Sequence, residues 1–228
     1  MTLEIIATSL TDVKQAEAYG ADRLELCTGI AEGGITPNYG LIAEAVKAAA
    51  IPINVMIRPH SESFMYNEDD LTVMKKDIQM VRELGANGIV IGALTADDMI
   101  DEAVLKQLLD EAQGLDVTFH REFDFARNQE EALACLAGYP QVKRILTSAG
   151  QQPAPQAVQN MKQLMQLAGN THLEIMAGHG LKADNFAKFY KETEPKEVHF
   201  GSGVREKGSF SYSIDERKMN DIKTVLRS

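Results

Sequence analysis

The chain has 228 residues, a length that suits one large domain or two small ones. Hydrophobic residues make up 44% of the chain and charged residues 25%, which excludes a disordered, collagen-like or low-complexity protein. The net charge of -10 disfavours nucleic acid and anionic membranes as partners, unless a local basic patch opposes it. The two cysteines, Cys27 and Cys135, are too few for a disulfide framework.

The sequence has no apolar run of about 18 residues, the length that a membrane-spanning helix needs. Met1 and Thr2 lead directly into the apolar run Leu3–Ala7, without the pattern of a secretory signal. We therefore expect a soluble cytoplasmic protein.

Short β-rich runs alternate with longer helical patterns along the whole chain. Each run has four to six residues and is bounded by turn signals, as is typical of buried parallel strands. The expected strands are Leu3–Ala7, Arg23–Cys27, Ile53–Arg58, Gly88–Gly92, Val117–Arg121, Arg144–Ser148, Leu173–Ala177 and Val198–Ser202. The expected helices are Asp12–Tyr19, Leu41–Ala49, Glu68–Leu84, Ala96–Gln113, Gln129–Ala137, Pro155–Ala168, Ala183–Glu192 and Ile214–Leu226.

Glycines separate the helical patterns from the strands that follow them. Gly20, Gly85, Gly138 and Gly169 each occupy the place where a helix commonly ends in a left-handed residue. No linker or change of composition interrupts the chain, so residues 1–228 are expected to form a single domain. Eight βα units leave a closed (β/α)8 barrel or an open doubly wound sheet. The even spacing favours a compact barrel of the TIM type, because Ala7–Thr11 lacks the Gly-rich fingerprint of the open alternative.

Alternation along the strands predicts which side chains point into the barrel. If the apolar set faces the helices, the interior receives charged and polar groups in place of the usual Val, Ile and Leu. The residues assigned to the interior are Glu4, Arg23, Glu25, Cys27, Asn54, Met56, Arg58, Thr118, His120, Glu174, Met176, Glu197 and His199. Isolated buried charges are costly, so these groups must pair with each other or meet water and a ligand. Interior salt bridges, such as Glu25 with Arg58, are the structural alternative to a functional site.

The carboxyl ends of barrel strands are where active sites form. Glycine-rich loops follow the last two strands, at Ala177–Gly180 and Gly201–Gly203. Such loops expose backbone N–H groups and hold a phosphate in many barrels. Candidate anion-binding residues at these ends are Ser148, Gly178, Gly180, Ser202 and Gly203. Arg58 or Arg205 could add charge-assisted hydrogen bonds.

Several sequence segments resemble motifs of the CutC family, in the same order and over nearly the whole chain. They are Arg23–Cys27, Glu32–Pro37, Val55–Pro59, Gly88–Leu94, Thr118–Asp124 and Arg144–Ser148. The resemblance implies a TIM barrel and a cytosolic copper homeostasis protein that binds Cu(I) and takes part in copper trafficking or tolerance. It also implies a homo-oligomer, which we expect to be a dimer because two-fold assemblies are common.

Copper binding has candidate ligands on the predicted interior. Cu(I) prefers thiolate, thioether and imidazole donors, and the interior offers Cys27, Met56, His120, Met176 and His199. Cys27 is the best single candidate, because Cys135 falls within a helical pattern. Each donor also has a packing role available to it, and no closely spaced ligand motif is present.

The alternative is an enzyme of unknown reaction that acts on a small anionic substrate, a class that includes phosphorylated compounds. In this interpretation Glu25, His120 and Asp124 perform acid–base work and Arg58 binds the anionic group. We expect Glu25, Arg58 and His120 to converge near the carboxyl ends of their strands, with the arginine and the carboxylate paired. A pure scaffold is a third class, and it has no need of charges inside a barrel.

Overall fold

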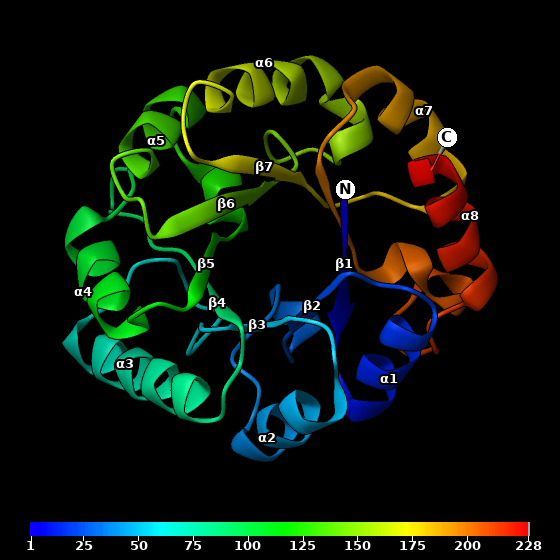
Figure 1. Cartoon of the computed structure of the whole chain (residues 1–228). Coiled ribbons are helices and arrows are strands. Elements are labelled where there is room, and N and C mark those ends of the chain that lie inside the picture. Colours follow the sequence, from blue (N-terminus) through cyan, green and yellow to red (C-terminus); the bar gives the residue numbers. More distant parts are fainter. Residues whose placement is uncertain (228) are drawn as a thin grey trace.

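The computed structural model of the protein describes residues 1–227, and these form a closed barrel of eight parallel strands (Figure 1). Neighbours in sequence pair with each other, and β8 pairs with β1 to close the ring. The strands are β1 (Thr2–Ala7), β2 (Arg23–Leu26), β3 (Ile53–Met56), β4 (Gly88–Ile91), β5 (Asp116–Phe119), β6 (Val142–Thr147), β7 (Glu174–Ala177) and β8 (Glu197–Phe200). The predicted barrel is confirmed, and each strand begins within two residues of its predicted start.

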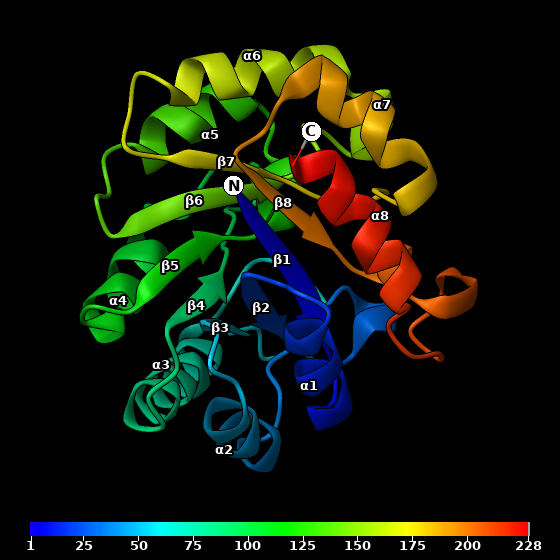
Figure 2. The same ribbon diagram turned by 45° about the vertical axis from the view of Figure 1, so that its right-hand side comes forward.

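Helices surround the barrel as an outer layer, as the views in Figures 1 and 2 show. They are α1 (Leu10–Ala18), α2 (Tyr39–Ala48), α3 (Glu68–Glu83), α4 (Glu102–Ala112), α5 (Gln129–Leu136), α6 (Val158–Ala168), α7 (Ala183–Thr193) and α8 (Glu216–Arg227). Short 3-10 turns are inserted after several strands: η1 (Ile30–Glu32), η2 (Arg121–Phe125), η3 (Ala154–Gln156), η4 (Ser202–Val204) and η5 (Glu206–Gly208). None of the helices in residues 1–227 combines the length and the apolar character that crossing a bilayer requires.

Three predicted helices begin later than expected, the eighth by only two residues, at Glu216. The fourth begins at Glu102 rather than Ala96, because the Thr95 hydroxyl accepts hydrogen bonds from the amides of Asp97 and Met99 and holds that segment in a turn. Asp101 then caps α4 by accepting the amide of Val104. The sixth begins at Val158, after the separate turn η3.

The glycine helix stops were correct at two of four positions. Gly20 and Gly85 have φ of 90° and 81°, the left-handed conformation that favours glycine. Gly138 and Gly169 do not have positive φ, and Gly169 is right-handed at -57°. Two further helices, α4 and α7, end in left-handed residues that are not glycine, Gln113 and Glu194.

Strand alternation divides the molecule into an apolar layer and a polar interior. Helix-facing side chains such as Leu24, Val55 and Phe119 are fully buried in the main core. The amino-terminal half of the interior is filled by an ionic chain of alternating sign. Its links are Glu4–Arg23 (2.5 Å), Arg23–Glu197 (2.5 Å), Glu197–Arg144 (3.0 Å) and Arg144–Asp116 (2.6 Å). Salt bridges therefore account for the charges in the amino-terminal half of the interior. They form an ionic chain between residues other than the expected pair of Glu25 and Arg58.

Candidate functional site

A cavity of about 290 Å³ opens at the carboxyl ends of the strands. Seven predicted site residues line it: Glu25, Cys27, His120, Gly180, His199, Ser202 and Gly203. Other predicted residues, namely Met56, Arg58, Asp124, Ser148, Met176 and Gly178, are not among its lining residues. The walls also include Arg121, His179, Lys182 and Phe210, which were not among the predicted site residues.

Glu25 is the interior carboxylate that lacks a counter-charge. Its side chain comes from β2 and is 2% exposed, and its Oε2 has no hydrogen-bond partner among the described residues. Burial raises the pKa of this carboxyl; the nearby imidazoles of His199 and His120 oppose the rise, while Glu4 and Glu122 add to it. A buried polar group without a partner is unusual, and Glu25 differs from most such groups of the described chain because it also lines the cavity.

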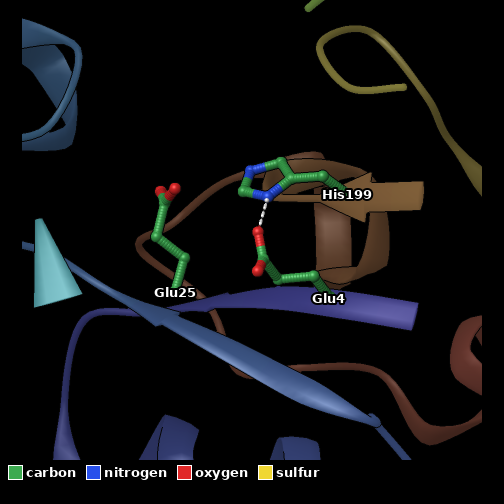
Figure 3. Close-up of side chains that lie close together, drawn as sticks. All are labelled: Glu4, Glu25 and His199. Atoms are coloured by element: carbon green, nitrogen blue, oxygen red, sulfur yellow. Dashed lines mark hydrogen bonds and ion pairs between the residues drawn. The ribbon is translucent and has the colours of Figure 1, made fainter. Parts of the chain in front are cut away.

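His199, from β8, is oriented from below by Glu4 of β1. The imidazole Nδ1 lies 2.8 Å from Glu4 Oε1, while Arg23 pairs with Glu4 Oε2 (Figure 3). Burial raises the pKa of Glu4, but Arg23 and His199 outweigh it and lower that pKa to about 2. Glu4 is therefore an ionised acceptor, and the Nδ1 of His199 carries a proton toward it.

His120 has a partner of the same kind that sequence reasoning missed. Its Nδ1 lies 2.9 Å from Oε2 of Glu122, which is buried in η2 just after β5. Burial lowers the pKa of His120, but the Glu122 carboxylate outweighs this and raises it. Gly92, directly after β4, makes room for Glu122, because a Cβ at that position would collide with the carboxylate. Glu122 lies within the motif Thr118–Asp124, but strand alternation ends at His120 and could not predict its direction.

Arg58 does not pair with Glu25, contrary to expectation. It is buried, and its guanidinium donates to the backbone oxygens of Glu32 (2.7 Å) and Gly34 (3.0 Å). The guanidinium also stacks on Phe64, 4.9 Å from the ring centroid. Within the described residues no carboxylate forms an ion pair with it, because the loop between β2 and α2 folds over the strand end and supplies carbonyl acceptors. Arg58 thus fixes this loop rather than forming the predicted trio.

Asp124 and Ser148 are hydrogen-bonded to each other. Asp124 accepts hydrogen bonds from the hydroxyls of Thr147 (2.5 Å) and Ser148 (2.8 Å), from the Ser148 amide and from Nε of Arg121 (3.0 Å). With its oxygens saturated, Asp124 holds the loop after β6 and positions Arg121 at the cavity. Asp124 thus lies outside the cavity lining with both oxygens engaged, although it was predicted to act as an acid or base there.

The two glycine-rich loops differ in what they can offer an anion. The amide of Gly178 already donates to the oxygen of Thr147 (2.9 Å), and a Cβ at Gly178 would press on Leu146 and His199. Among residues 1–227, the amides of Gly180, Ser202 and Gly203 have no described acceptor and flank the cavity. Arg205 is not available to an anion, because both of its terminal nitrogens bind Asp12, at 3.0 and 2.8 Å.

The predicted copper donors fall into a sulfur pair, a deeper methionine and the two histidines of the cavity wall. Cys27 and Met56 belong to one small buried cluster with Val90. Met176 lies deeper, where its sulfur accepts from Arg23 at 3.2 Å. Burial raises the pKa of the Cys27 thiol, and the Glu25 carboxylate adds to this, so the thiol form is favoured. The thiol and one thioether are adjacent, but the five donors are not gathered.

One group of possible metal ligands does come together. Glu4, Glu25 and His199 offer ligand atoms that all lie within 4.8 Å of one another, and all three residues are buried. Cys27 is not part of any such group of histidine, cysteine, aspartate and glutamate within the described chain.

Comparisons with known proteins agree on one family. The model of the CutC family matches residues 1–204. A family protein CutC from Bacteroides fragilis is 40% identical over 217 residues, covering 95% of this chain and 86% of the relative, and one from Glaesserella parasuis is 37% identical over 219 residues, covering 96% and 89%. A solved structure described as a proposed copper homeostasis protein CutC from Streptococcus agalactiae has a TM-score of 0.82 at 35% identity, over 88% of this chain and 98% of that one.

A more distant likeness extends to the fold alone. Phosphoribosyl anthranilate isomerase from Thermococcus kodakaraensis has a TM-score of 0.67 at 19% identity, over 100% of this chain and 99% of its own.

The pairing of His120 with Glu122 makes the first testable prediction. Replacing Glu122 by Gln removes the carboxylate that raises the pKa of His120, so that pKa should fall and burial should dominate. An NMR titration of the His120 ring protons measures it. Glu130→Gln, an exposed change in the first turn of α5, should leave the titration unchanged. An unaltered His120 titration in Glu122→Gln would contradict the assigned pairing.

Proposed function

From the premise that the chain belongs to the CutC family, we propose that it is an enzyme that binds a small anionic molecule in its barrel mouth and transfers a proton to or from it. The observation that carries this proposal is the pairing of two features in one cavity. The imidazole of His120 is held by Glu122, and Oε2 of the buried Glu25 has no hydrogen-bond partner within residues 1–227. A protein that served only as a scaffold would have no reason to retain an uncompensated charge there.

The anionic character of the bound molecule is argued from the rim of the cavity. Arg121 and Lys182 bring positive charge, and the amides of Gly180, Ser202 and Gly203 bring donors. Backbone donors and basic side chains around one cavity favour a phosphate or carboxylate, although the whole chain is acidic. The cavity volume limits the ligand to a small molecule.

Proton transfer is assigned to His120. Glu122 engages its Nδ1, so the other ring nitrogen, Nε2, is the one free to exchange a proton with a bound molecule. Glu25 lies in the same cavity, where it can contact the reacting part of that molecule. Asp124 acts indirectly, by holding Arg121 through Nε.

Binding of Cu(I) as cargo is a second candidate function, and one contact favours it. The thiol of Cys27 and the side chain of Met56 share a buried cluster, and both are donor types that Cu(I) prefers. His120 and His199 each keep one ring nitrogen free of the carboxylate partners and could complete such a site. Support also comes from the Streptococcus agalactiae relative, which is described as a proposed copper homeostasis protein. The expected cytoplasmic location and homodimeric assembly stay predictions.

The anion proposal is tested with inorganic phosphate as the probe. Titration should shift the NMR signals of the Ser202 and Gly203 amides, and Arg121→Gln or Lys182→Gln should each weaken binding by roughly tenfold, the worth of a charge-assisted hydrogen bond. Lys47→Gln, an exposed change on α2, is the charge-matched control and should bind phosphate as the parent does. If phosphate leaves those two amides unmoved, or if the control weakens binding equally, the anion site is refuted.

The copper proposal is tested by competition with a Cu(I) chelator. Cys27→Ala should lose at least about tenfold in Cu(I) affinity, because thiolate is the strongest donor in the cluster. Cys135→Ala is the matched control, since Cys135 is half-buried in α5 away from the cavity. Equal retention of Cu(I) by both variants would remove the support for copper binding at this site.

A further inference from the structure

We propose that Glu25 and the Nε2 atom of His199 hold a divalent transition cation, of the kind represented by Zn²⁺ or Mn²⁺, at the bottom of the mouth cavity. Figure 3 shows the residues involved. Glu4, Glu25 and His199 come from β1, β2 and β8 respectively, β1 lying between the other two, and their ligand atoms lie within 4.8 Å of one another. The inference deepens the proposed function by naming a cation that the bound anion would contact. Only this contact between cation and anion rests on the proposed function; the cation site itself does not.

Glu4 serves as the orienting carboxylate in this group. One of its oxygens accepts from Nδ1 of His199 at 2.8 Å, and the other pairs with Arg23 at 2.5 Å. Both oxygens are therefore engaged within the protein. Histidines that bind metals usually donate their second ring N–H to a carboxylate in this way, which fixes the ring and makes the opposite nitrogen a better ligand.

The free edge of His199 faces Glu25. In Figure 3 the ring nitrogen that does not bind Glu4 lies on the side toward the Glu25 carboxylate. That nitrogen carries a lone pair when Nδ1 carries the proton. Glu25 Oε2, which is buried, has no hydrogen-bond donor among the described residues. Two electron-pair donors thus lie close together, an arrangement that a cation would stabilise.

The charge of Glu25 and its access to solvent also support a cation at this position. The other acidic groups beneath this point are compensated, because Glu4 and Glu197 both pair with Arg23. Glu25 retains the uncompensated negative charge, and a divalent cation would offset it. Glu25 and His199 both line the mouth cavity, so an ion can enter from solvent. The coordination positions not filled by protein would be open to water or to the proposed anion.

The donor types select the class of cation. Imidazole suits Zn²⁺ and related transition ions, and a carboxylate suits Mn²⁺ as well, whereas Cu(I) prefers sulfur. The proposed pair contains no sulfur, and Cys27 does not belong to the group of clustered ligands. This site therefore excludes the sulfur pair of Cys27 and Met56, and a Cu(I) site built on that pair would share only His199 with it.

Calorimetric titration of the chelator-treated full-length protein with Zn²⁺, and separately with Mn²⁺, tests the inference. The buffer contains neither phosphate nor thiol, so the result does not depend on the anion. We expect one equivalent to bind, with at least about tenfold weaker affinity in both Glu25→Gln and His199→Gln. Cys27→Ala should bind as the parent does, and so should His172→Gln, which changes a histidine outside the cavity. Circular dichroism verifies that each variant is folded.

The outcomes separate this inference from the proposed function. No binding of either ion at millimolar concentration overturns it, as does parental affinity in Glu25→Gln and His199→Gln. Loss of the ion in Cys27→Ala also overturns it, because it would place the ion on the thiol. Cation binding without any response to phosphate upholds the cation site and refutes the anion proposal. Phosphate binding by a protein that binds neither cation upholds the anion proposal and overturns the cation site.

Discussion

The shared carboxylate of Glu4 is the interaction on which the interior of the barrel depends. One of its oxygens compensates Arg23 and the other orients His199. Through Arg23 it joins an ionic chain that continues to Glu197, Arg144 and Asp116 and fills the amino-terminal half of the interior. Such a chain is stable in a low dielectric because every member has an opposite charge beside it.

The pairing of opposite charges ends at the carboxyl-end side of this ionic chain. Glu25 is the next acidic group toward the carboxyl ends of the strands, and its Oε2 has no partner in the described chain. The change from paired to unpaired charge occurs where the cavity begins, which separates a stabilising lower layer from a layer that meets ligand. Proteins commonly give up stability at such places, since groups arranged for a ligand are not arranged for each other.

The sequence predicted the fold well because the signals were local and repeated. Alternating strands gave the inward direction of Glu25, Cys27, His120 and His199, all of which line the cavity. The parts that failed depend on loops, whose direction has no period to read. Arg58 turned to backbone carbonyls that a loop supplied, and Asp124 was saturated by the hydroxyls of Thr147 and Ser148. Glu122 and Lys182 reach the site region from turns beyond the strand ends, so alternation could not place them.

The central claim is that Glu4 is compensated and Glu25 is not, and a matched pair of variants tests it most directly. The measurement is the Tm of metal-free Glu25→Gln and Glu4→Gln as a function of pH. Because the folded-state pKa of Glu25 is raised, its ionised form destabilises the fold as pH rises through that pKa. Glu25→Gln should therefore raise the Tm at pH 7 by roughly 2 °C or more, and the gain should vanish in acid. Glu4→Gln should lower the Tm, because it leaves the buried charge of Arg23 without this partner, and breaking a buried pair in this way costs about 3–5 kcal/mol. A fall in Tm of similar size in both variants would contradict the account.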